Sequence, residues 1–341
     1  MSMRTNHDDL AYHLTKFFTV YLPNQRNLSQ GTIKVYRDVF RLLLVFLEKK
    51  KKIRPQKVTM ELIDRNCIEE FISWIHEDRG CNPKTCNNRL AAIKSFFNYL
   101  QFEQPDRAFQ CKEILDIRFM KAQDKELSYL TVEGIKKLLE QPDIKTKTGR
   151  RDLTILSVLY DTGARVQEIS DLKLKDVRLI APATVSITGK GGKTRIVPLL
   201  SETEKLLRQY ISDFHIKEMG SDAPLFQNRD CEQLTRYGIT YILNKYVKMA
   251  RSESPELIPD NISPHSIRHS KAMHLLQANV NIVYIRDLLG HSSVTTTEVY
   301  ARADTTLKRE ALEKANPLKD RPAMPQWTDD EGLMEWLTNL V

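Results

Sequence analysis

The sequence predicts a mainly α-helical protein with a small antiparallel β-sheet. Most of the chain repeats apolar residues every three or four positions, as helices with one buried face do. Only residues 183–199 alternate with period two, around a glycine-rich turn, which is typical of a β-hairpin. A chain of 341 residues is too long for one small core, so we expect an N-terminal helical bundle followed by an α+β domain.

The first 104 residues predict the bundle, with basic faces. Its four helices are expected at about 9–21, from a cap at Ser29 into the lysine run at 49–52, at 64–78 and at 85–102. Residues 105–127 are rich in Arg and Lys and lack a clean period. We therefore expect them to form an interdomain linker.

The second domain is expected over residues 128–316. Thr131 can cap its first helix, Asp152 can start the next one, and Gly163 can end it because glycine tolerates positive φ. Further helical patterns cover 202–214, 237–250, 264–277 and 282–289. In the tail, residues 317–341, prolines break the chain before Thr328, which can cap a last helix with Leu333, Trp336, Leu337 and Leu340 on one face.

Composition narrows the class of protein. The net charge is +6 over residues 1–104, +5 over 105–316 and −3 over 317–341, so both large segments suit a polyanionic partner. No apolar run approaches the roughly 18 residues of a membrane span, and the N-terminus does not read as a signal peptide. The 5 cysteines are odd in number and have no CxxC spacing, which favours a reducing compartment without disulfides or a zinc site.

One set of side chains points to chemistry on a phosphodiester. When an alcohol attacks phosphorus, charge builds on the non-bridging oxygens, and fixed cationic donors lower the barrier. Arginine suits this role because its planar fork matches phosphate. Tyrosine can be the nucleophile, and a lysine on a hairpin turn can protonate the leaving oxygen. The candidate catalytic residues are Arg165, Lys190, His265, Arg268, His291 and Tyr300.

Each of these residues also has an ordinary explanation when taken alone. A single tyrosine is more often core or surface, and Lys193 could serve in place of Lys190. His265 and His269 are spaced four apart, as metal ligands can be, but no acidic residue stands between them as in HExxH. The order and spacing of the whole set favour the chemical interpretation, without a metal.

The motifs resemble those of the tyrosine recombinases, the phage integrase family that includes the Xer proteins. Three boxes carry this likeness: Thr162-Gly-Ala-Arg165-Val-Gln-Glu168, Gly189-Lys190-Gly-Gly-Lys193-x-Arg195-x-Val-Pro-Leu199, and Pro264-His265-x-x-Arg268-His269 with Leu289-Gly-His291 and Tyr300. The resemblance is close over residues 128–305 and looser over 8–104, which are similar to the family's core-binding domain. It implies that the scissile phosphate is held by Arg165, His265, Arg268 and His291. It also implies that Lys190 is the general acid, that Tyr300 is the nucleophile and that Glu168 supports the site.

The resemblance also implies partners. The protein is expected to bind double-stranded DNA recombination sites, as a dimer on one site and a tetramer in the synapse, without a cofactor or metal. A cytoplasmic, nucleoid-associated protein of a prokaryote is implied, and integration or excision of a mobile element is the expected role. The tail helix is expected to dock on a neighbouring protomer, with docking on its own chain as the alternative. Candidate DNA contacts are Lys49, Lys50, Lys51, Lys52, Arg89, Lys94, Lys193 and Arg195; the lysine run can equally be a solvated helix end.

Two other functions remain open at this point. A DNA-binding regulator could share the fold without the activity, although it would not need Tyr300. A relaxing topoisomerase of the type IB kind would share the chemistry but would not exchange partners. The sequence does not identify the DNA site, and it does not separate an integrase from a resolvase or an invertase.

Overall fold

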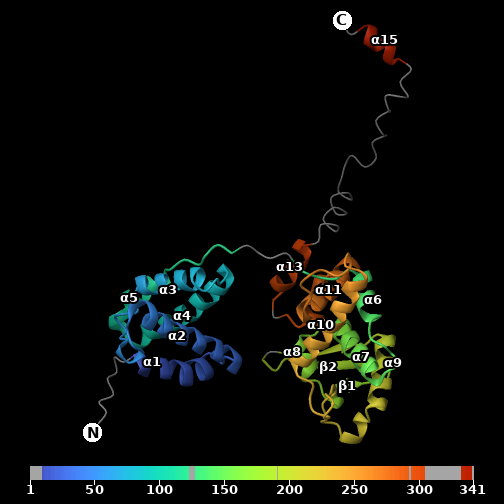
Figure 1. The fold of residues 1–341 in the computed structure, drawn as a ribbon, viewed down its shortest axis with the longest axis horizontal. Helices are drawn as coiled ribbons and strands as arrows, with labels where there is room; N and C mark the ends of the chain where they lie inside the picture. The colour runs from blue at the N-terminus through green and yellow to red at the C-terminus, as the bar shows by residue number, and fades with distance from the viewer. Residues whose placement is uncertain (1–9, 123–126, 190, 292, 304–331, 340–341) are drawn as a thin grey trace. The chain divides into compact units, whose positions relative to one another are not determined.

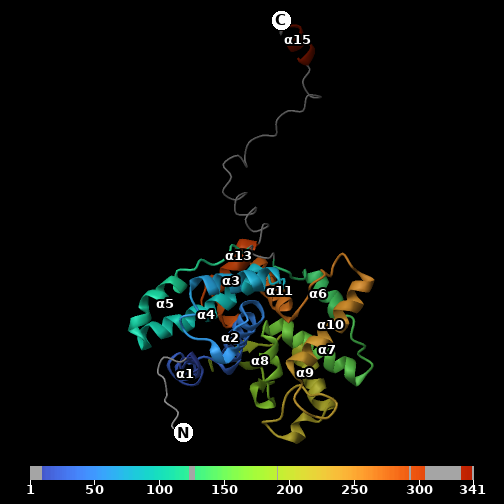
Figure 2. The same ribbon diagram turned by 60° about the vertical axis from the view of Figure 1, so that its left-hand side comes forward.

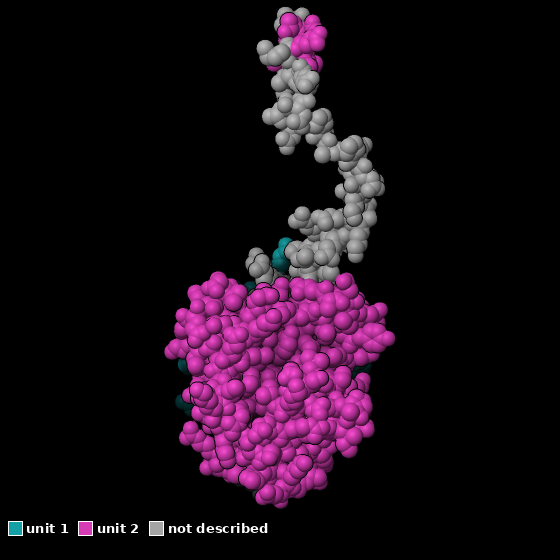
Figure 3. All heavy atoms as spheres, turned by 90° about the vertical axis from the view of Figure 1, so that its right-hand side faces the viewer, with its two compact units in different colours: residues 1–125 teal, residues 126–341 magenta. Residues whose placement is uncertain are grey.

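The chain folds into two compact units, residues 1–125 and 126–341 (Figures 1 and 3). In this computed structural model, the described residues are 10–122, 127–189, 191–291, 293–303 and 332–339. Each unit has its own hydrophobic core.

The first unit is a helical bundle built around α4, which lies beside α2, α3 and α5 (Figures 1 and 2). Its elements are α1 (Leu10–Lys16), which continues as the π-helix η1 (Phe17–Gln25), α2 (Gln30–Lys51), the short η2 (Pro55–Lys57), α3 (Arg65–Glu77), α4 (Pro83–Glu103), η3 (Pro105–Arg107) and α5 (Ala108–Leu115). The expected cap at Ser29 is confirmed, because its hydroxyl accepts a hydrogen bond from the Thr32 amide. Edge-to-face aromatic pairs among Phe17, Phe40 and Phe96 fill the core.

The expected linker is wrong over its first part, because α5 belongs to the bundle. Cys111 and Ile114 of α5 are fully buried in the core of the first unit. Farther along, Asn87 of α4 holds the backbone of Met120 through two hydrogen bonds of 2.8 Å. A helix as short as α5, with basic residues at its margins, shows too little periodicity to be recognised from the sequence.

The second unit combines helices with a three-stranded antiparallel sheet of order β1-β2-β3. Its elements are α6 (Val132–Leu139), α7 (Lys147–Thr162), α8 (Val166–Ser170), η4 (Leu174–Asp176), β1 (Val177–Arg178), β2 (Thr184–Thr188), β3 (Thr194–Pro198), α9 (Ser201–Asp213), η5 (Ile216–Met219), α10 (Arg236–Glu253), α11 (Pro264–Gln277), α12 (Ile282–Leu289), α13 (Thr295–Ala303) and α15 (Leu333–Thr338). The predicted hairpin is confirmed as β2 and β3. Val185 and Val197 of the hairpin share one core with Leu159 of α7.

Local sequence signals correctly predicted two of the helix ends in this unit. Thr131 caps α6 by accepting from the Gly134 amide, and Gly163 ends α7 with a φ of +55°, both as predicted. The predicted start at Asp152 is wrong. α7 begins after a cap at Thr146, and Asp152 lies buried inside the helix, where it accepts a hydrogen bond from Tyr246.

Two features of the second half bear on function. α13 was not expected, and it carries Tyr300. In α15 the side chains of Trp336 and Leu337 are about half exposed, whereas the predicted cap Thr328 and Leu340 lie outside the described residues. Among the described residues, no helix combines the length and apolar character needed to cross a membrane.

Candidate active site

Helix α11 presents two of the candidate side chains, His265 and Arg268. Its start is fixed by Ser263, which accepts from the Ser266 amide, and by a proline at the first helical position. From this start, His265 is exposed at the helix surface, whereas Arg268, one turn later, is only 3% exposed. A guanidinium buried this deeply must find internal hydrogen-bond partners.

Arg268 joins the ends of two other helices. Its two terminal nitrogens donate to the carbonyl oxygens of Gly163, at 2.8 Å, and Leu289, at 2.7 Å, where α7 and α12 end. Both carbonyls lie at the negative ends of helix dipoles, so a cation is favoured there. Burial and the nearby charge of Arg165 lower the pKa of Arg268 to about 10, which still leaves it charged at neutral pH.

Arg165 caps the start of α8 and is held by Glu168. The buried carboxylate of Glu168 accepts from the side chain of Arg165 at 2.8 Å and from its backbone amide at 3.0 Å. It also accepts from Arg195 of β3 at 2.7 Å. Burial alone would raise the pKa of Glu168, but these hydrogen bonds and the adjacent charges lower it. Glu168 therefore stays ionised and ties two arginines together, which is consistent with the supporting role expected for it.

Arg195 links the hairpin to the loop that carries His291. Its Nε donates to the carbonyl of Leu288 at 2.8 Å, and a Cβ added at Gly290 would lie only 3.0 Å from its guanidinium. Gly290 also has a φ of +67°, so glycine is favoured there on both grounds. Arg195 was expected to contact DNA. Because its side chain is mostly buried in these internal contacts, we assign it a positioning role instead.

The nucleophile candidate Tyr300 lies inside this cluster, only 4% exposed. The ring of His291 is nearly parallel to it, with 14° between planes and 6.4 Å between centroids, and His291 Nδ1 lies 2.9 Å from the hydroxyl of Thr297. Burial, followed by the charges of Arg268 and Arg165, lowers the pKa of His291 to about 4. Burial raises the pKa of Tyr300, against the opposing effect of the two arginines.

His269 is a site residue that sequence reasoning missed. Its Nδ1 lies 3.0 Å from the hydroxyl oxygen of Tyr300. The sequence offered two signals, its place in the third family box and its spacing of four from His265, but neither gave it a role in the chemistry. Among the described residues, no group of three or more His, Cys, Asp or Glu side chains is arranged to hold a metal ion.

The hairpin turn stands beside Glu168. A Cβ added at Gly189 would lie 3.1 Å from the Glu168 carboxylate, and the Gly189 amide donates to the Lys193 carbonyl at 2.9 Å. Lys193 is exposed in this turn. Lys190 itself lies outside the described residues.

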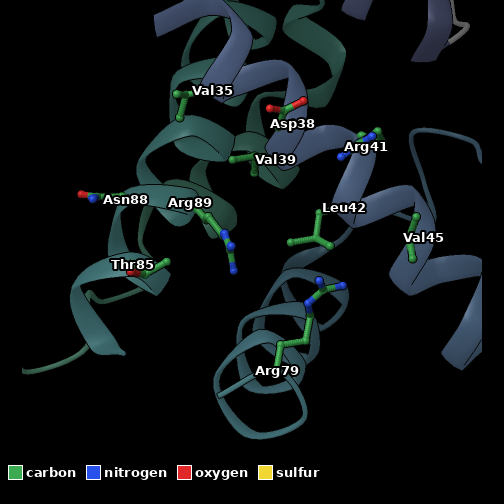
Figure 4. Close-up of a pocket in the computed structure, with 10 residues that line it drawn as sticks. All are labelled: Val35, Asp38, Val39, Arg41, Leu42, Val45, Arg79, Thr85, Asn88 and Arg89. Carbon is green, nitrogen blue, oxygen red and sulfur yellow. The ribbon is translucent and has the colours of Figure 1, made fainter. Parts of the chain in front are cut away.

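A second candidate surface lies in the first unit. α2 and α4 border a groove together with Arg79, two residues beyond the end of α3, and Arg79 and Arg89 extend toward it (Figure 4). Arg41 of α2 is a third cation of its lining. Such a groove offers charge for phosphates and an apolar floor between two helices.

The other lysines of this unit that were expected to contact DNA differ in their surroundings. Lys49 and Lys52 are exposed, but Lys50 and Lys51 pair with Asp78 and Glu70. Lys94 points inward and donates to the carbonyls of Leu115 and Ile117. We therefore assign Lys94 to the packing of α4 against the segment after α5, and not to DNA.

Replacing the three groove arginines together (Arg41→Ala, Arg79→Ala, Arg89→Ala) is expected to weaken DNA binding and to flatten its dependence on salt. For each phosphate that the variant no longer binds, the slope of log K against log [salt] should fall by about 0.9. Fluorescence anisotropy with a labelled duplex at several salt concentrations measures this slope. Arg65→Ala is the control, because Arg65 pairs with Glu69 on α3. An unchanged slope in the triple variant would rule out the groove as a DNA contact.

Each of the two units matches a known protein family. Residues 128–306 match the phage integrase family, and residues 16–104 match the phage integrase N-terminal SAM-like domain. The chain is 35% identical over 336 residues to the provisionally named integrase/recombinase y4rC of Sinorhizobium fredii, which covers 98% of this chain and 100% of that protein.

Two further proteins extend the comparison. The chain is 30% identical over 299 residues to tyrosine recombinase XerD of Staphylococcus haemolyticus, which covers 87% of this chain and 96% of that one. The fold is similar to that of the XerH site-specific recombinase bound to a palindromic difH substrate in a post-cleavage complex. That comparison has a TM-score of 0.67 and 24% identity, and it covers 84% of this chain and 81% of the other.

Proposed function

This chain belongs to the phage integrase family of tyrosine recombinases, which are enzymes, and we propose that it cuts and rejoins DNA through a covalent bond between DNA and Tyr300. The observation that carries the proposal is the position of the Tyr300 hydroxyl, 3.0 Å from His269 Nδ1 and within the field of Arg268 and Arg165. Cationic groups arranged around a buried oxygen nucleophile favour attack on a phosphodiester.

In the proposed first step, the Tyr300 oxygen attacks the scissile phosphorus while the bond to the 5′-oxygen breaks. Arg165 and Arg268 stabilise the charge on the non-bridging oxygens because their guanidinium groups are already held in place by Glu168 and by two helix ends. His265 and His291 donate further hydrogen bonds to the phosphate. Lys190 gives a proton to the 5′-oxygen as it leaves.

The products of this step are a 3′-phosphotyrosyl bond and a free 5′-hydroxyl. A 5′-hydroxyl from a partner duplex then attacks the phosphotyrosine, which restores the tyrosine and joins the new strand. The covalent bond conserves the energy of the phosphodiester, so the scheme requires neither ATP nor a cofactor. Each chain supplies one nucleophile, and we propose that two protomers act on each duplex and four in the synapse.

The biological role that we propose is integration or excision of a mobile element by a DNA-associated cytoplasmic protein. It is supported by the 35% identity to y4rC, whose name describes an integrase/recombinase. The tail supports assembly, because Trp336 and Leu337 of α15 expose apolar surface that a neighbouring protomer can cover.

The test uses a duplex that the protein selects from a randomised pool, nicked near the cleavage position so that the covalent product accumulates. A recombinase forms the adduct and also exchanges strands between two labelled duplexes. An adduct with relaxation of supercoiled DNA but without exchange would identify a topoisomerase. DNA binding without any adduct would identify a regulator and overturn the proposal.

A further inference from the structure

We propose that His269 is the general base that removes the proton from the Tyr300 hydroxyl. The inference rests on the proposed function, and it assigns a role that neither the motifs nor the scheme above gives to this residue. Its first support is distance: Nδ1 of His269 and the Tyr300 oxygen are 3.0 Å apart, within the reach that proton transfer needs.

The other histidines of the site are less well placed for this task. His265 is exposed at the start of α11, and its ring centroid lies 6.4 Å from that of His269. His291 stands parallel to the phenol, and its Nδ1 is engaged by Thr297. Among the described histidines, His269 is the one whose ring nitrogen forms a hydrogen bond with the nucleophile.

The surroundings keep His269 neutral, which is the form that can accept a proton. Burial, together with the neighbouring His265 and the charge of Arg268, lowers the pKa of His269 to about 4, so the ring is neutral near pH 7. The same burial makes the ring a weaker base, so the proton has to move as the Tyr300 oxygen attacks phosphorus and not before. The tyrosine must give up its proton with help, because burial raises the pKa of Tyr300. Arg268 lies close enough to stabilise the phenolate oxygen as it forms.

The proton balance is complete within the site. The O–H bond of Tyr300 breaks and its proton passes to Nδ1 of His269, while the freed electron pair forms the bond to phosphorus. The bond between phosphorus and the 5′-oxygen breaks, and that oxygen takes its proton from Lys190. In the rejoining step His269 returns its proton to the departing tyrosine oxygen, and Lys190 recovers a proton from the attacking 5′-hydroxyl.

His269→Asn is the informative variant. The Asn side-chain oxygen can still accept a hydrogen bond from Tyr300, but it cannot take the proton. Two nicked duplexes are compared in single-turnover cleavage, one with the ordinary 5′-oxygen and one with a bridging 5′-sulfur, which leaves without needing a proton. We expect His269→Asn to slow cleavage of both by about 10²- to 10⁴-fold. Lys190→Ala should be slow only on the oxygen substrate.

A second readout separates base catalysis from simple positioning. Without a base, cleavage by His269→Asn should rise with pH, toward tenfold per pH unit, as hydroxide takes over deprotonation. Wild type should change far less between pH 7 and 9. His215→Asn is the matched control, because His215 is an exposed histidine paired with Glu218, and it should behave as wild type.

The outcomes are distinct. Two outcomes show that His269 is not the base. In the first, wild type forms an adduct and His269→Asn cleaves at a rate within about threefold of the wild-type rate. In the second, the 5′-sulfur substrate rescues His269→Asn as it rescues Lys190→Ala. If wild type forms no adduct on either substrate, the proposed function itself fails. As a control, the thermal unfolding temperature and DNA affinity of His269→Asn are compared with those of His215→Asn. If they differ, His269→Gln is measured in the same way. Cleavage by His269→Gln at the wild-type rate overturns the proposal.

Discussion

Tyr300→Phe is expected to abolish the covalent adduct completely while the protein still folds and binds DNA. The phenyl ring keeps its place in the cluster of Ala272, Met273, Ile285 and Leu289, so only the hydroxyl is lost. Losing one hydrogen bond of this kind costs about 1 kcal/mol of stability, which does not unfold the domain. The adduct is measured on denaturing gels with the nicked duplex, and affinity by anisotropy.

The control for this variant is Tyr284→Phe. Tyr284 lies on α12 with 70% of its surface exposed, so its hydroxyl can be removed without disturbing the core. It should form the adduct at the wild-type rate. An adduct that persists in Tyr300→Phe would mean that another residue is the nucleophile, and the assignment of the whole cluster would have to change.

Arg165→Lys and Arg268→Lys are expected to lose activity alike but to differ in stability. Both should slow cleavage by about 10²- to 10³-fold, because an ammonium group cannot replace the two-pronged contact with phosphate. Arg165 is partly exposed and bonds mainly to Glu168, so its replacement should barely change the thermal unfolding temperature.

Arg268→Lys, in contrast, should also destabilise the second unit. Lysine cannot reach the Gly163 and Leu289 carbonyls in the same geometry, and a buried unpaired carbonyl costs about 1–3 kcal/mol. Single-turnover rates and thermal unfolding of the two variants are compared with Arg286→Lys, a surface control that pairs with Asp287. Equal loss of stability in both variants, or cleavage at the wild-type rate in either, would contradict this division of roles.

The sequence predicted those parts of the fold that depend on local chemistry. The caps at Ser29 and Thr131 and the glycine end of α7 are set by a few adjacent atoms, so they can be recognised without knowledge of the tertiary structure. α5 and α13 were missed because they are short and are stabilised by packing against other helices. The start of α7 was misplaced because an aspartate resembles a cap even when it is buried within a helix.

The motifs predicted which residue types gather at the site, but not which way each side chain points. In β3 the strand turns Arg195 inward with Val197 and leaves Ile196 71% exposed, the reverse of what hydrophobicity alone suggests. The ion pair with buried Glu168 stabilises that inward arginine. The role of His269 was missed for a similar reason, because its partner Tyr300 lies on α13, which the sequence did not predict.

The central claim is the covalent link to Tyr300, and mapping that link tests it most directly. The adduct formed on the nicked duplex is digested with protease and nuclease, and the peptide that retains a nucleotide is sequenced by mass spectrometry. We predict a 3′-phosphate joined to Tyr300, with a free 5′-hydroxyl on the other strand end. A link to any other residue, or a tyrosine joined to a 5′-phosphate, would contradict the account.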